Sequence, residues 1–186
     1  LPQCKPICLE IEDLEVRFGD RKVLQNFVLT LEGGQLVAVV GRNGIGKTTL
    51  LRSIAGFQKH SGKIYMATQS GERPPDMGIV FQNPDLQLFN PSVRDEILYK
   101  IVTPDLGYYS ALVSALGLSP YENTPPLLLS EGEKKRLALA LVMMQRPADG
   151  LLLDEPSLGQ DDVHKTILSS LLRSLTQIGQ LVIMTT

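Results

Sequence analysis

Residues 41–48 constrain this chain more than any other stretch of its sequence. They read Gly41-Arg42-Asn43-Gly44-Ile45-Gly46-Lys47-Thr48 and fit the pattern G-x-x-x-x-G-K-[ST]. The glycines allow the loop to curl, so that successive backbone N–H groups point at one centre, which a triphosphate fills. The apolar run 36–40 leads into the loop, and a helix predicted over 48–55 follows it and adds the positive end of its dipole. This order of strand, loop and helix predicts a phosphate-binding site.

Two side chains of the loop carry the expected chemistry. The Lys47 ammonium is expected to reach the β- and γ-phosphates of ATP, and the Thr48 hydroxyl is expected to ligate Mg²⁺. The loop residues expected to bind the triphosphate are Gly41, Arg42, Asn43, Gly44, Ile45, Gly46, Lys47, Thr48 and Thr49.

A second apolar run, 151–153, ends in the two carboxylates Asp154 and Glu155. A strand of this kind delivers both carboxylates to the carboxyl edge of the sheet, where open α/β folds bind their ligands. Neighbouring side chains of a strand point in different directions. Asp154 is therefore expected to face the Mg²⁺ through a water molecule, while Glu155 faces the attacking water. An apolar run with two acids is also an ordinary strand end, and only its combination with the loop favours the catalytic interpretation.

The spacing of apolar residues predicts an α/β fold. Alternation over 7–18 predicts two strand segments with a kink at Asp13, and 23–31 predicts another strand of an N-terminal antiparallel part. The run 36–40 predicts a strand buried on both faces, as in a parallel sheet. Further strands are expected over 62–66, 78–82, 151–153 and 181–184, with an amphipathic helix over 161–175. Strands alternating with helices predict a phosphate-loop core with a largely parallel sheet flanked by helices.

The sequence over 83–130 differs in composition from the segments before it. Six prolines punctuate two helix-like stretches, 93–101 and 108–116, and a longer helix is expected over 131–145. We therefore expect a single domain, in which 1–82 and 147–186 form the nucleotide-binding core and 83–146 an inserted helical subdomain.

Residues 129–136, Leu-Ser-Glu-Gly-Glu-Lys-Lys-Arg, resemble the signature LSGGQ of the ATP-binding-cassette (ABC) superfamily. Glu131 replaces the first glycine and Glu133 the glutamine, whereas Ser130 and Gly132 are intact. The resemblance implies that Ser130, Gly132 and Glu133 face the γ-phosphate of ATP on a partner subunit. Ser130 and Glu133 also have the spacing of a helix capping box, and both interpretations can hold together. The three basic residues that follow, 134–136, are expected to be solvated charges or, alternatively, to lie near a phosphate.

The other family landmarks follow in order, so the resemblance covers essentially the whole chain. Phe18 matches the aromatic residue that stacks on adenine, or is a strand core residue. Gln82 matches the glutamine that senses Mg²⁺ and the γ-phosphate, and Asp161 the acidic residue of the D-loop. The run 81–85, Phe-Gln-Asn-Pro-Asp, is similar to that of energy-coupling-factor importers. The resemblance thus implies Lys47, Gln82 and Glu155 as catalytic residues, with Thr48, Gln82 and Asp154 holding Mg²⁺.

The family resemblance also implies the working partners. The expected function is an ATP-hydrolysing subunit of a metal-ion or vitamin importer, peripheral at the cytoplasmic face of the cell membrane. It would pair head to tail with itself or a paralogous ATPase and contact transmembrane subunits. Leu86 and Phe89 are expected to line a groove for a short helix of such a subunit, whereas Leu88 equally suits the core of the helical insertion. The alternatives are a soluble ABC ATPase of translation or DNA repair and a non-hydrolysing nucleotide-binding module.

Composition narrows these alternatives. The chain has 18 basic and 20 acidic residues and a net charge of −2, which argues against a broad basic surface and a nucleic-acid partner. Its longest apolar run, 137–144, is far shorter than the roughly 20 residues of a membrane span. Cys4 and Cys8 are expected to be reduced thiols. The switch histidine of the family would follow Thr186, so we expect a chain truncated before that loop; neither His60 nor His164 is assigned its role.

Overall fold

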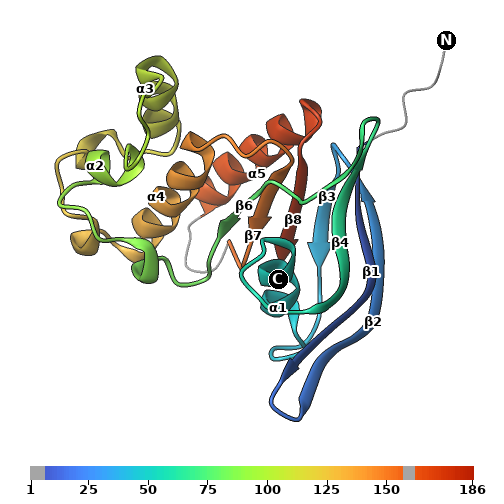
Figure 1. The fold of residues 1–186 in the computed structure, drawn as a ribbon. Helices are drawn as coiled ribbons and strands as arrows, with labels where there is room; N and C mark the ends of the chain where they lie inside the picture. Colours follow the sequence, from blue (N-terminus) through green and yellow to red (C-terminus); the bar gives the residue numbers. More distant parts are fainter. Residues whose placement is uncertain (1–6, 157–161) are drawn as a thin grey trace.

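The computed structural model describes residues 7–156 and 162–186. One sheet is antiparallel and has the order β2-β1-β4-β5, and the other is parallel and has the order β3-β8-β7-β6. Figure 1 shows the antiparallel sheet at one end of the molecule and helices α2, α3 and α4 at the other, with the parallel sheet between them. The predicted α/β fold, with its antiparallel part, parallel core and helical insertion, is confirmed.

The antiparallel sheet consists of β1 (Cys8–Phe18), β2 (Arg21–Glu32), β4 (Ser61–Thr68) and β5 (Gly71–Arg73). Its inner face buries Leu9, Ile11, Leu14 and Val16. The predicted kink at Asp13 is a bulge within one continuous strand, since Asp13 has a φ of +47° and the pairing register shifts between Ile11 and Leu14. The extra residue restores the inward phase of the apolar side chains. The short strand β5 was not predicted.

The parallel sheet consists of β3 (Leu36–Val39), β6 (Met77–Val80), β7 (Gly150–Leu153) and β8 (Leu181–Thr185). The two central strands, β7 and β8, are almost wholly buried. The prediction that 36–40 is buried on both faces is wrong: Leu36 is 46% and Val40 78% exposed. In the described part of the chain β3 pairs with β8 alone, so it is an edge strand that turns only Val37 and Val39 toward the core.

Five helices and three 3-10 turns complete the described part of the chain around these sheets. Helix α1 (Lys47–Ile54) follows the glycine-rich loop, and α5 (Asp162–Gln177) precedes β8. The helical part comprises the 3-10 turns η1 (Pro84–Gln87), η2 (Ser119–Tyr121) and η3 (Pro126–Leu128) and the helices α2 (Val93–Ile97), α3 (Leu106–Ala115) and α4 (Glu131–Met144). Helix α2 is shorter than predicted, because the chain turns at Lys100, which has a φ of +60°.

One hydrophobic cluster joins the helical part to the parallel sheet. It contains Val93, Leu112 and Leu137 from the helices together with Leu151 and Val182 from β7 and β8. Leu88 belongs to this cluster, so the interpretation of Leu88 as a core residue is confirmed. The helices are thus anchored to the sheet that carries the two carboxylates, and the subdomain boundaries at 82 and 147 stay a prediction.

Candidate functional site

The start of helix α1 is shaped for an anion. Its N-cap is Gly46, with a φ of +115°, and neither a side-chain cap nor an acidic residue occupies the first turn. A Cβ at Gly46 would come within 2.9 Å of Val23 Cγ1, so both the backbone conformation and the space require glycine here. Lys47 is buried and its Nζ donates a hydrogen bond to the Gly41 carbonyl at 2.6 Å. The first N–H groups of the helix therefore have no internal side-chain acceptor and suit a phosphate.

A cavity of about 680 Å³ opens at this helix start. The predicted site residues that line it are Phe18, Asn43, Gly44, Gly46, Lys47, Thr48, Thr49, Gln82 and Glu155. Phe18 is half exposed and leaves an open aromatic face at the rim. Arg21 and Val23 also line the cavity and were missed, because nothing in the β1–β2 turn sequence marks them as ligand contacts.

The carboxylate of Asp154 lies at the end of β7 and contacts two hydroxyl groups. Thr48 Oγ1 donates to Asp154 Oδ2 at 2.8 Å, and Thr185 Oγ1 donates to Asp154 Oδ1 at 2.7 Å. Thr185 is fully buried at the end of β8 and was missed by the sequence analysis. Parallel strands bring their carboxyl ends to one sheet edge, and this is what joins residues 106 positions apart.

Glu155 turns away from Asp154 toward the cavity. Its backbone has a φ of +50°, a conformation that is uncommon for a residue with a side chain. The Glu155 N–H donates to Thr185 Oγ1 at 3.0 Å, and Gln82 Nε2 donates to Glu155 Oε2 at 2.7 Å. The strained backbone and these two contacts hold the carboxylate at the cavity mouth.

The oxygen atoms at this sheet edge have the chemistry of a magnesium site. Thr48, Asp154 and Gln82 offer hydroxyl, carboxylate and amide oxygens, which are the ligands that Mg²⁺ prefers. Among the described residues no three His, Cys, Asp or Glu side chains gather to hold a metal ion by themselves. The residues present therefore fit a cation that nucleotide phosphates also help to bind, as is usual for Mg²⁺.

The signature segment lies outside this cavity, at the start of helix α4. Ser130 and Glu133 form the predicted capping box: Glu133 Oε2 accepts from the Ser130 N–H at 2.7 Å, and Ser130 Oγ accepts from the Glu133 N–H at 3.4 Å. Hydrogen bonds from Tyr121 and from the Ser130 N–H hold the pKa of the Glu133 carboxyl below its ordinary value. The capping interpretation is confirmed, and Asp161 lies outside the described residues.

The basic residues after the capping box are not the solvated charges that were predicted. Lys134 is only 8% exposed, and its Nζ lies 2.9 Å from Asp85 Oδ1. Lys135 is also buried, and together with Asp154 and Glu155 it lines a narrow cavity. Burial lowers the pKa of the Lys135 ammonium, against the opposing effect of the Glu131 and Glu155 carboxylates. Helix α4 packs on η1 and β6, which turns these lysines inward.

A parallel sheet with a glycine-rich loop before its first helix and an Asp-Glu pair at the carboxyl end of a central strand defines a phosphate-loop nucleotide-binding protein. Residues 24–158 match the family described as "ABC transporter". The chain therefore belongs to the ABC transporter family. No helix in the described ranges 7–156 and 162–186 has the length and apolarity to cross a membrane.

Known proteins of this family resemble the chain over nearly its whole length. It is 34% identical to a putative ABC transporter ATP-binding protein of Enterococcus faecalis, with 91% of this chain and 32% of that protein aligned. It is 33% identical to the energy-coupling factor transporter ATP-binding protein EcfA of Methanothermobacter thermautotrophicus, with 92% and 60% aligned. The chain thus spans about a third of the length of the first of these relatives.

Solved structures give the same result. The structure of cbiO1 from Clostridium perfringens, described as part of the ABC transporter complex cbiONQ, has a TM-score of 0.78 and 28% identity, with 98% of this chain and 79% of that chain covered. A bacterial Atm1-family ABC exporter with ATP bound has a TM-score of 0.84 at 21% identity, with 100% of this chain and 36% of that chain covered, a likeness of fold alone.

Proposed function

We propose that this chain binds and hydrolyses Mg·ATP as the nucleotide-binding subunit of a membrane importer for a metal ion or vitamin. One observation carries the proposal: Thr48, Gln82 and Glu155 line the phosphate-loop cavity, and the Thr48 hydroxyl donates a hydrogen bond to the Asp154 carboxylate beside it. The names of the relatives EcfA and cbiO1 support a transport role of the energy-coupling-factor type.

Each residue has a role in this proposal. Phe18 stacks on the adenine, the N–H groups of residues 41–49 hold the phosphates, and Lys47 exchanges its contact with the Gly41 carbonyl for the β- and γ-phosphate oxygens. Thr48, Gln82 and Asp154 hold Mg²⁺, which neutralises phosphate charge when bound. Glu155 accepts a hydrogen bond from the attacking water and polarises it toward the γ-phosphorus.

The proposed assembly is a head-to-tail pair of ATPase subunits, either two copies of this chain or one copy and a paralogue. Ser130, Gly132 and Glu133 of each subunit then face the ATP of the other. Closing and opening this dimer moves the transmembrane subunits docked on it. The chain would work at the cytoplasmic face of the membrane as a peripheral subunit.

Replacing Glu155 tests the catalytic proposal. Glu155→Gln keeps the hydrogen-bonding shape but removes the base, so we expect ATP to bind normally and hydrolysis to fall by about 10²–10⁴. Phosphate release gives the rate, and size-exclusion chromatography with ATP should reveal dimers that accumulate because ATP is not consumed. Hydrolysis at the parent rate would refute the role of Glu155.

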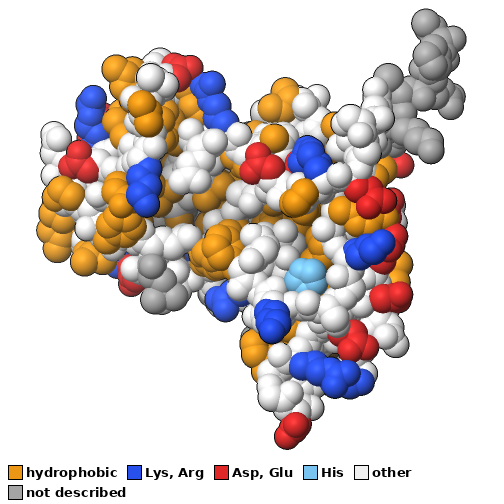
Figure 2. All heavy atoms as spheres, in the orientation of Figure 1, with side chains coloured by type: hydrophobic (Ala, Val, Ile, Leu, Met, Phe, Trp, Pro, Cys, Tyr) orange, Lys and Arg blue, Asp and Glu red, His pale blue; other side chains and the backbone are white. Residues whose placement is uncertain are grey.

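A hollow of about 690 Å³ is the proposed docking site for the transmembrane subunit. Phe89 and Tyr99 line one side, with ring centroids 4.9 Å apart, and Phe57 lines the other. Phe57 contacts the ring of Phe81, which directly precedes Gln82, so this hollow is one side-chain contact away from the nucleotide site. Figure 2 shows apolar side chains on the face between the helical part and the core. The side chain of Leu86 lies outside the described part of the structure.

An acidic substitution in this hollow tests the docking proposal. Phe89→Asp should weaken assembly with co-expressed transmembrane subunits while leaving ATP affinity nearly unchanged, because it replaces an aromatic contact with a charge in a hollow that Glu96 and Lys100 also line. Val102→Asp is the matched control, since Val102 is 94% exposed and does not line the hollow. Normal assembly of Phe89→Asp, or its failure to fold, would contradict the proposal.

A further inference from the structure

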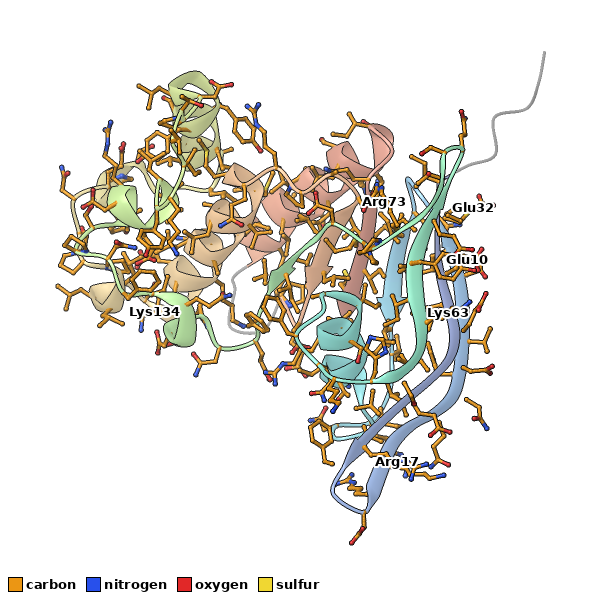
Figure 3. All side chains as sticks on the ribbon, in the orientation of Figure 1. Glu10, Arg17, Glu32, Lys63, Arg73 and Lys134 are labelled. Atoms are coloured by element: carbon orange, nitrogen blue, oxygen red, sulfur yellow. The ribbon has the colours of Figure 1, made fainter. Side chains whose placement is uncertain are left out.

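The ion pair between Lys134 and Asp85 joins two segments that the proposed mechanism treats separately. Lys134 lies in the first turn of α4, four residues after the signature serine Ser130, and Asp85 lies in η1, three residues after Gln82. Figure 3 labels Lys134 where α4 begins, beside the turn η1. The hydrogen bond to Asp85 is the largest effect raising the pKa of the Lys134 ammonium. Glu131, also within reach, lies farther from Nζ, at 3.8 Å.

The Asp85 side of the pair is fixed by local structure. Asn83, the residue after Gln82, caps η1 and accepts a hydrogen bond from the Asp85 N–H at 3.0 Å. Gln82 in turn contacts Glu155 in the nucleotide cavity. A continuous series of contacts therefore runs from Glu155 through Gln82 and the capped turn to Lys134.

Burial of the lysine distinguishes this pair from an ordinary surface ion pair, while its partner Asp85 is 42% exposed. Arg146 and Asp105 are as close, at 2.8 Å, but their side chains are 57% and 54% exposed. The Lys134 side chain is 10% exposed, so its position depends on its partner far more than that of a solvated lysine. Exposed pairs contribute little because water and salt screen them, whereas a nearly buried ammonium needs a carboxylate beside it.

We propose that Lys134 and Asp85 are a positioning pair that couples the start of helix α4 to the Gln82 segment. This proposal rests on the proposed function, because it assumes that Gln82 contacts the γ-phosphate bound in the chain's own loop. Binding of the γ-phosphate then moves residues 82–85, and the ion pair with Lys134 moves the turn that carries Ser130. The readiness of the signature turn to meet a partner's ATP would then depend on the nucleotide bound by the same chain.

Hydrogen exchange in the Glu155→Gln background, which holds ATP intact, tests this coupling. At a protein concentration low enough to keep the chain monomeric, so that no partner's ATP contacts 129–136, we expect these amides to exchange differently with ATP than with ADP in the Glu155→Gln parent. Asp85→Asn, and independently Lys134→Met, should reduce this difference at least twofold while the difference at 82–88 persists. The double charge reversal Asp85→Lys with Lys134→Asp should restore it, which a merely structural role for either residue would not produce.

Asp105→Asn is the matched control, since it removes an ion pair of similar length and keeps a side chain able to cap α3. It should leave the ATP-minus-ADP difference at 129–136 unchanged. A full difference in both Asp85→Asn and Lys134→Met would overturn the coupling, as would the absence of any difference at 129–136 in the parent with ATP bound. Equilibrium titration with ATP reports separately on the proposed function.

Discussion

The starts of helices α1 and α4 differ in how the N–H groups of their first turns are satisfied. Each helix has N–H groups in its first turn that lack a partner within the helix. At α1 the N-cap is Gly46, no side chain caps the helix, and the first turn has no acidic residue. At α4 Ser130 and Glu133 satisfy the first N–H groups themselves, and Glu131 adds a second negative charge to that turn.

At the α1 start the N–H groups need a bound ligand as their acceptor, whereas at the α4 start the chain's own side chains are the acceptors. The α1 start carries the buried ammonium of Lys47 beside uncapped N–H groups, an arrangement that is costly without a bound anion and favourable with one. The α4 start is stable without a ligand, because carboxylates near a helix N-terminus interact favourably with the positive end of the helix dipole. Loss of the charged side chain at the α1 start should therefore act mainly on ATP binding, and loss of the capping side chains at α4 mainly on folding and assembly.

The largest effect is expected from Lys47→Ala. This change removes the fixed positive charge inside the loop and one or more charge-assisted hydrogen bonds, each of which contributes about 1.5–3 kcal/mol. ATP affinity should fall by about 10- to 100-fold for each bond lost, as measured by equilibrium titration. An unchanged affinity would contradict the assignment of the site and would remove the contrast between the two helices.

A smaller effect is expected from Gly46→Ala. The left-handed backbone at Gly46 costs a non-glycine residue roughly 1–2 kcal/mol, and the new Cβ would also press on Val23 at 2.9 Å. The free energy of unfolding without nucleotide should fall accordingly, as measured by denaturant titration. Gly44→Ala is the matched control, because Gly44 also has a positive φ but nothing lies within 4 Å of the added Cβ. Equal losses in the two variants would show that the contact with Val23 is unimportant.

Both helix starts were predictable from the sequence because their signals are local. The glycine spacing before Lys47 and the three-residue spacing from Ser130 to Glu133 determine the local backbone, and the structure has both. Because these signals are local, they do not predict which strands are neighbours in the sheet, and this explains the wrong prediction for 36–40. Residues 36–40 and 151–153 are similar apolar runs, yet β3 is an edge strand and β7 a central one. Hydrophobic periodicity reports what one strand can bury, not how many neighbours it has.

The site residues that the sequence did not predict are brought into place by tertiary contacts. Thr185 reaches Asp154 because β7 and β8 are neighbours, a pairing that no residue spacing encodes. Lys134 appeared to be a solvated charge because its partner, Asp85, lies in a turn about fifty positions earlier that α4 covers. Sequence patterns thus predicted the candidate site residues, while the contacts that position those residues depended on packing.

The smallest effect is expected from Ser130→Ala at the α4 start. Loss of the capping hydroxyl should lower the free energy of unfolding by about 1 kcal/mol, since the Glu133 N–H loses its acceptor. ATP affinity of the chain's own loop should stay at the parent value, because Ser130 does not line that cavity. Ser92→Ala is the matched control: Ser92 caps α2 by accepting from the Asp95 N–H at 3.1 Å, so the loss in free energy of unfolding should be similar.

In the Glu155→Gln background only Ser130→Ala should also reduce the ATP-driven dimer. If both serine variants dimerise like the parent, Ser130 is a cap alone and the α4 start has no role in binding a partner's ATP.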